Sequence, residues 1–170
     1  MKIKWIHMYL DMAKRAAEES HGVRLKVGAI FVSPDGVMSM GINGLPAGGE
    51  NECEVREYMQ PDAGGWLDLA EMETNWPYVD GVWDTGYIKR YRLVTKDETS
   101  HAEQNLFAKL MKQGVSTKGG MLFTTDSPCI HCAKIIVGAG ITHVYYIRDY
   151  RITAGVDWLV HNGVQVIKVD

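Results

Sequence analysis

The stretch HAEQNLFAKLMKQGVSTKGGMLFTTDSPCIHCAKIIVGAGITHVYYI, residues 101–147, indicates the fold of this 170-residue chain. Along this stretch, segments whose apolar residues recur with a helical period alternate with short apolar runs typical of buried strands. The expected elements, with two more beyond this stretch, are a helix over 101–113, a strand over 121–125, a helix over 129–139, a strand over 142–147, a helix over 152–162 and a strand over 164–169. Such alternation is typical of an α/β domain whose later strands run largely parallel, with helices on both faces.

The residues upstream add one helix and one hairpin. The spacing of apolar residues predicts an amphipathic helix over about 5–20, and the apolar run VGAIFVS, residues 27–33, suits a buried strand. A turn at Pro34-Asp35-Gly36 leads to a second strand over 37–43. We therefore expect a three-layer α/β/α sandwich around a five-stranded mixed sheet.

The segment 50–98 differs from its surroundings in composition. It holds 12 acidic and 5 basic residues, a local charge of −7, which leaves +4 for the rest of the chain. It contains Trp66, Trp76 and Trp83 but shows little periodicity. Because these aromatic side chains need burial, we interpret the segment as an ordered insertion within a single domain of residues 1–170. A disordered acidic loop is the alternative interpretation. The aromatic residues of the segment could serve in an oligomer contact or in a lid over the site.

Bulk properties narrow the class of protein. The formal net charge of −3 argues against a protein that coats long nucleic acid, because such proteins carry a basic face. Three cysteines are too few for a disulfide framework and favour reduced thiols in the cytoplasm. The charged N-terminal segment has no signal-peptide core, and no apolar run reaches the roughly 18 residues that a membrane helix needs.

Two short motifs at the starts of predicted helices carry the types of residue that bind metals. His101 and Glu103 form H-x-E in one motif, and Cys129 and Cys132 form P-C-x-x-C in the other. Cysteines three apart share one face of a helix, and a helix N-terminus lowers the pKa of a thiol, which favours the thiolate that a metal requires. One His and two Cys leave a tetrahedral zinc ion with one open position, as in catalytic sites. Glu103 could accept a proton from water at that position and return it.

Each motif alone is weak evidence, but together they form the signature of zinc-dependent nucleobase deaminases, in which the Glu serves as acid and base. One alternative is a structural zinc site closed by Cys53 or His131 as a fourth ligand. A redox C-x-x-C pair is another, although it leaves His101 and Glu103 without a role. A second zinc site that includes Cys53 is a further alternative.

The wider sequence resembles the deoxycytidylate (dCMP) deaminase family. The resemblance lies in HAEQN (101–105), SPCIHCAK (127–134), RLKVGA (24–29) and GINGLPAG (41–48), and it covers nearly the whole chain apart from much of the acidic segment. The second position of GINGLPAG is usually Tyr in that family and is Ile42 here. The resemblance implies a cytidine-deaminase-like fold and the zinc-dependent hydrolysis of dCMP to dUMP and ammonia, which supplies dUMP for thymidylate synthesis.

Several residues could bind such a substrate. Arg24 and Lys26 precede the first strand and could meet a phosphate, while the amide of Asn43 suits a sugar hydroxyl. Tyr150 follows a predicted strand, where open α/β sheets place ligands, and could stack on a pyrimidine. A solvated basic pair, an ordinary glycine-rich loop and a packing tyrosine are the alternatives. The resemblance places Ser127 among the substrate-binding residues.

The glycine-rich loop could also bind a ligand, because glycine lets the backbone approach a ligand closely. The resemblance implies that an allosteric nucleotide binds at Gly41, Ile42, Asn43, Gly44 and Gly48. It also implies activation by dCTP, inhibition by dTTP, Mg²⁺ with the bound triphosphate, and a homohexamer. The rival functions are another deaminase, acting on dCTP, cytidine or tRNA adenosine, and a non-catalytic zinc- or nucleotide-binding module.

Overall fold

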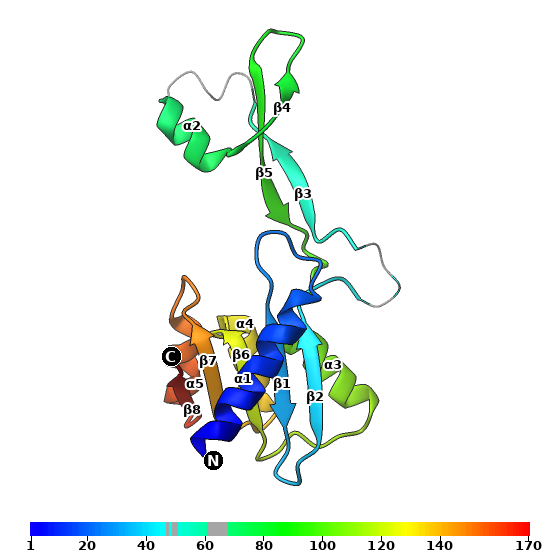
Figure 1. Cartoon of the computed structure of the whole chain (residues 1–170), viewed down its shortest axis with the longest axis vertical. Helices are drawn as coiled ribbons and strands as arrows, with labels where there is room; N and C mark the ends of the chain where they lie inside the picture. Colours follow the sequence, from blue (N-terminus) through cyan, green and yellow to red (C-terminus); the bar gives the residue numbers. More distant parts are fainter. Residues whose placement is uncertain (47, 49–50, 61–67) are drawn as a thin grey trace.

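A computed structural model of the chain describes residues 1–46, 48, 51–60 and 68–170. The main body of the protein contains four helices and five strands in these described ranges (Figure 1). They are, in chain order, α1 (Ile3–Glu18), β1 (Gly28–Val32), β2 (Met38–Ile42), α3 (Ala102–Lys112), β6 (Met121–Asp126), α4 (Ile130–Gly138), β7 (His143–Arg148), α5 (Ala154–His161) and β8 (Gln165–Lys168). No helix of this described part is both long and apolar enough to cross a membrane.

The five strands form one mixed sheet in the order β2-β1-β6-β7-β8. β1 pairs antiparallel with both β2 and β6, whereas β6, β7 and β8 run parallel to one another. Parallel neighbours need a crossover connection, which α4 and α5 supply. The structure confirms the three-layer α/β fold with a five-stranded mixed sheet that was expected from the sequence.

The sheet is covered on both faces by apolar side chains. Successive residues of a strand point to opposite faces, so Ala29 and Phe31 of β1 pack with α3, α4 and α5, while Ile30 and Val32 pack with α1. All five residues of β1 are buried, because this strand lies inside the sheet with helices on either side. This double coverage explains the near-continuous apolar run in the sequence.

A second sheet projects away from the body (Figure 1). It is antiparallel, with the strand order β3-β5-β4, and we call residues 54–95 the arm. The arm consists of β3 (Glu54–Tyr58), α2 (Leu69–Asn75), β4 (Tyr78–Val82) and β5 (Ile88–Thr95). Within the expected insertion, Trp66 lies outside the described residues.

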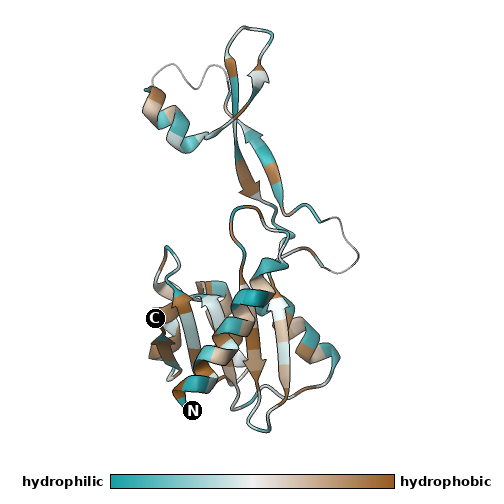
Figure 2. Ribbon diagram, in the orientation of Figure 1, coloured by the Kyte–Doolittle hydropathy of each residue, from teal (hydrophilic) through white to brown (hydrophobic). Residues whose placement is uncertain are grey.

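In its described residues the arm has no apolar stripe of the kind that makes a strand recognisable from sequence, and Figure 2 shows polar and apolar residues mixed along its strands. Cations cover its aromatic rings instead: Arg92 lies 4.7 Å from the Trp76 ring centroid and Arg56 lies 4.9 Å from that of Tyr91. Because charged and aromatic side chains share the same faces, the period of two is lost in the sequence.

Candidate metal centre

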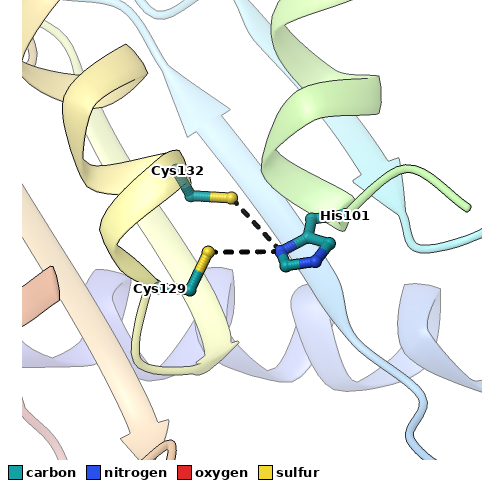
Figure 3. Close-up of side chains that lie close together, drawn as sticks. All are labelled: His101, Cys129 and Cys132. Atoms are coloured by element: carbon teal, nitrogen blue, oxygen red, sulfur yellow. Dashed lines mark hydrogen bonds between the residues drawn. The ribbon is translucent and has the colours of Figure 1, made fainter. Parts of the chain in front are cut away.

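The three side chains that the sequence assigns to a metal lie together (Figure 3). The ligand atoms of His101, Cys129 and Cys132 all lie within 4.8 Å of one another, and Nδ1 of His101 is 3.4 Å from each sulfur. Neither Cys53 nor His131 belongs to this cluster. Three ligands leave a tetrahedral ion with one position for water or substrate.

Two of the ligands occupy helix N-caps. His101 and Cys129 have extended backbones, and α3 and α4 begin at the residue after each, one position later than expected from the sequence. The backbone N–H of His101 donates a hydrogen bond of 2.7 Å to Oε1 of Gln104, which fixes the ligand at the end of its helix. Cys132 lies in the first turn of α4, so both sulfurs face the positive end of that helix.

The charges of the two thiols are coupled. The pKa of Cys129 is lowered to about 3, first because Cys132 donates a hydrogen bond to its sulfur and also because His101 interacts with it. The same contact with Cys129, together with burial, raises the pKa of Cys132. The pair alone therefore holds one negative charge, and a divalent cation would compensate a second thiolate. Two sulfurs and one imidazole nitrogen form a donor set that zinc prefers, so these residues fit a zinc ion.

Glu103 lies beside the ligands in the first turn of α3. Only 4% of its surface is exposed, and it lines the same cavity as His101 and Cys129. Burial raises the pKa of its carboxyl group. A raised pKa makes the carboxylate a stronger base toward water, as a general acid and base requires.

The cavity has a volume of about 470 Å³ and lies between the body and the base of the arm. Four of the five residues expected to bind substrate line it, namely Arg24, Asn43, Ser127 and Tyr150. The structure does not place Lys26 there. Its amino group donates a hydrogen bond of 3.1 Å to the backbone carbonyl of Glu18, and it lines a separate, smaller hollow.

Asn43 and Ser127 also hold parts of the cavity wall together. The Asn43 side chain accepts hydrogen bonds from the hydroxyl of Ser20 (2.7 Å) and the N–H of Val27 (2.8 Å), and it donates one to the carbonyl of Leu25 (2.8 Å). Among the described residues nothing accepts the second N–H of its amide, which remains for a ligand. The hydroxyl of Ser127 accepts a hydrogen bond of 2.8 Å from the N–H of Tyr150.

The glycines of the glycine-rich loop are required for different structural reasons. A Cβ atom at Gly41 would lie 2.2 Å from the carbonyl oxygen of Ala102, so this glycine permits β2 to pack against α3. The sequence analysis expected this glycine to let the backbone approach a ligand, but the structure shows that it allows two elements of the body to pack together. Gly44 forms a bridge with Ser100, and Gly48 has a φ of +94°. Ile42 accepts a hydrogen bond of 2.8 Å through its backbone carbonyl from the side chain of Asn105.

Several residues of the cavity wall were not predicted from the sequence. Asp126, 7% exposed, accepts hydrogen bonds of 2.7 Å from Arg148 and from the hydroxyl of Thr125. Its place at the end of a buried strand, directly before the cysteine motif, could have indicated it. The others are Leu25, Val27, Glu54, Val94, Thr95, Thr99, Ser100, Ala102 and Arg151. Residues 54, 94 and 95 belong to the arm, where no motif or periodicity pointed to a site.

An open three-ligand zinc centre with a buried carboxyl group at its side, built on an α/β sandwich, defines the class of zinc-dependent deaminases. Comparisons with known proteins agree. Residues 3–148 match the family model described as the cytidine and deoxycytidylate deaminase zinc-binding region. The deoxycytidylate deaminase of Enterobacteria phage T4 is 30% identical over 173 residues, covering 94% of this chain and 87% of that protein. The human deoxycytidylate deaminase is 27% identical over 150 residues, covering 86% of this chain and 66% of the human protein.

A solved structure extends this likeness to three dimensions. The dCMP deaminase of cyanophage S-TIM5, crystallised with dCMP and dUMP, superposes with a TM-score of 0.74 at 33% identity and covers 99% of both chains. The chain therefore belongs to the cytidine and deoxycytidylate deaminase family. The cluster of His101, Cys129 and Cys132 lies within the stretch that matches the zinc-binding region of that family.

Proposed function

We propose that the protein catalyses the hydrolytic deamination of dCMP to dUMP and ammonia, which supplies dUMP for thymidylate synthesis. One observation carries this proposal: Glu103, the metal ligands His101 and Cys129, and the guanidinium-bearing Arg24 all line one cavity. A site for proton transfer and a cation for phosphate are thus within one volume. The likeness to deoxycytidylate deaminases, one of them crystallised with dCMP and dUMP, supports the choice of substrate.

The chemistry divides among the residues of the cavity. His101, Cys129 and Cys132 would hold zinc, which when bound lowers the pKa of a water molecule toward neutrality. Glu103 accepts a proton from the attacking water and delivers it to N3 of the cytosine while the water oxygen bonds to C4. Glu103 then takes the remaining proton from the new C4 hydroxyl and gives it to the 4-amino group, so that the C4–N bond breaks, ammonia leaves and the C4 carbonyl of dUMP forms.

The remaining wall residues bind and orient the nucleotide in this proposal. Arg24 pairs with the phosphate, for which a planar guanidinium is well suited. Asn43 offers its free N–H to a sugar hydroxyl, and Tyr150 stacks on the pyrimidine ring. Ser127 fixes Tyr150 through the hydrogen bond to its backbone. Lys26 is left out of this arrangement because it lies outside the cavity wall.

The test is a substrate panel of dCMP, dCTP, cytidine and deoxycytidine, with loss of the 4-amino group as the measurement. We expect the largest kcat/KM for dCMP. A larger value for cytidine or for dCTP would refute the substrate assignment while leaving the deaminase chemistry intact. A tRNA substrate is disfavoured because the segment 50–98, which reaches the cavity, carries a net charge of −7.

We also propose the regulatory features that the family resemblance implies: activation by dCTP, inhibition by dTTP, Mg²⁺ with the triphosphate, and assembly as a homohexamer. The proposed nucleotide site comprises Gly41, Ile42, Asn43, Gly44 and Gly48. Residues 1–170 would form one deaminase domain with the arm as an insertion. Titration of both triphosphates during dCMP turnover, with the mass in solution measured in parallel, tests this. A flat response to both nucleotides would contradict the regulatory part.

A further inference from the structure

The loop that carries Arg24 has little structure of its own. Residues 19–27 lie between α1 and β1 outside any helix or strand, and the side chains of Val23, Arg24 and Leu25 are exposed. On the side of the body, Asn43 holds the loop by bonding to the backbone of Leu25 and Val27. The opposite side of the loop meets the base of the arm.

Glu54, the first residue of β3, makes that second contact. One oxygen of its carboxylate, Oε1, accepts hydrogen bonds from two consecutive backbone N–H groups, those of Val23 at 3.0 Å and Arg24 at 3.1 Å. Consecutive N–H groups that converge on one anionic oxygen form a strong, charge-assisted arrangement. The carboxylate is thus bonded to the backbone and fixes the direction in which the Arg24 side chain leaves the loop.

The arm also contacts the guanidinium group. Nη1 of Arg24 donates a hydrogen bond of 3.3 Å to the hydroxyl of Thr95, which lies directly opposite Glu54 in the β3–β5 pairing. Among the described residues no acidic side chain forms an ion pair with Arg24, so none of them neutralises its guanidinium charge directly. The paired residues Glu54 and Thr95 therefore hold the backbone and the guanidinium group of Arg24, and the positive charge of that group remains available to an anion.

We propose that Glu54 is a positioning residue for phosphate recognition: it acts through Arg24, and by this contact the arm sets the preference for a nucleotide over a nucleoside. This inference rests on the proposed function, because it takes Arg24 as the phosphate ligand. It gives the arm a role in specificity that the zinc motifs do not contain. A carboxylate in a phosphate site would ordinarily repel the ligand, and here Oε1 of Glu54 is bonded to two backbone N–H groups of the loop.

The test compares Glu54→Ala, Glu54→Gln, Arg24→Ala and the double variant. The measurements are KM and kcat for dCMP, together with the dissociation constants of dUMP and deoxyuridine, whose ratio reports the contribution of the phosphate. We expect Glu54→Ala to raise KM for dCMP and Kd for dUMP about tenfold, with kcat and the Kd for deoxyuridine changed less than about twofold. Glu54→Gln retains an acceptor oxygen and should stay within about threefold of the parent protein.

The double variant identifies the route of the effect. If Glu54 acts through Arg24, Glu54→Ala adds nothing to Arg24→Ala, because no guanidinium remains to be positioned. Multiplied effects in the double variant, or equal losses for dUMP and deoxyuridine, would overturn the inference. If Arg24→Ala itself leaves the dUMP-to-deoxyuridine ratio unchanged, the phosphate assignment of the proposed function fails instead.

The chain offers a matched control on the same strand. Glu57 belongs to β3 and pairs with Arg92, through hydrogen bonds of 2.9 Å from both Nε and Nη2, away from the cavity wall. Glu57→Gln removes one carboxylate from the arm without changing a contact of the loop. The ratio of the dissociation constants of dUMP and deoxyuridine should therefore stay at the parent value. A loss in this variant equal to that of Glu54→Ala would show a general effect of arm charge, and would refute a specific role for Glu54.

Discussion

Replacing Glu103 by Gln is the sharpest test of the chemistry assigned to the cavity. The change keeps the shape of a side chain that is only 4% exposed and removes its ability to carry a proton. General acid–base groups contribute about 10²–10⁴ in rate. The structure points to the upper half of that range, because the other carboxylates of the described wall are engaged: Asp126 with Arg148, and Glu54 with backbone N–H groups. We expect kcat to fall by at least about 10³, equivalent to about 4 kcal/mol.

The assay measures single-turnover loss of the 4-amino group of dCMP alongside the zinc content per chain. Glu103 is not among the three metal ligands, so zinc should stay at the parent level while turnover collapses. Glu98→Gln, an exposed substitution five residues upstream, is the control and should leave kcat unchanged. If Glu103→Gln kept full zinc and more than a tenth of the parent kcat, the role of Glu103 as proton carrier would be wrong.

Three further predictions test the metal, the packing and the arm. Cys132→Ala should lose bound zinc and nearly all turnover, because one of three ligands is removed; metal analysis and the dCMP assay check this. Gly41→Ala should lower stability by about 2 kcal/mol, roughly 4–8 °C in Tm, because its Cβ would lie 2.2 Å from the carbonyl oxygen of Ala102. Asp80→Asn should lower the Tm by a few degrees at most at pH 7. The hydroxyl of Tyr58 holds the pKa of Asp80 below its ordinary 3.8, so the difference from the parent should vanish as pH falls through that lowered value.

Each of these predictions has a control in the chain. Cys53→Ala removes a buried thiol outside the metal cluster and should retain zinc. Gly138→Ala adds a Cβ that meets nothing within 4 Å at the end of α4, and it should be neutral or slightly stabilising. Tyr58→Phe should reduce the pH dependence that Asp80→Asn removes, since it deletes the same hydrogen bond. Zinc retained in Cys132→Ala, an unchanged Tm in Gly41→Ala, or a Tm difference for Asp80→Asn that grows in acid would each contradict the corresponding reasoning.

The sequence by itself determined the body of the fold and the metal ligands. Strand β1 was readable because a strand covered on both faces must be apolar throughout, and the α4 region was readable because its cysteines repeat at helical spacing. His101, Cys129 and Cys132 were predictable for a chemical reason: a zinc ion demands particular donor atoms, and few residue types supply them.

Only the tertiary structure decided which of the nearby polar residues reach the cavity. Arg24 and Lys26 are two positions apart and chemically alike, yet Arg24 lines the cavity and Lys26 bonds to the end of α1. Glu54 carries no motif, and its contact with the Arg24 loop spans 30 residues of sequence. Metal ligands are constrained by chemistry that acts locally in the sequence, whereas a phosphate site depends on where separate segments meet. That meeting is set by the pairing of β3 with β5 and by the packing of the arm's base on the body.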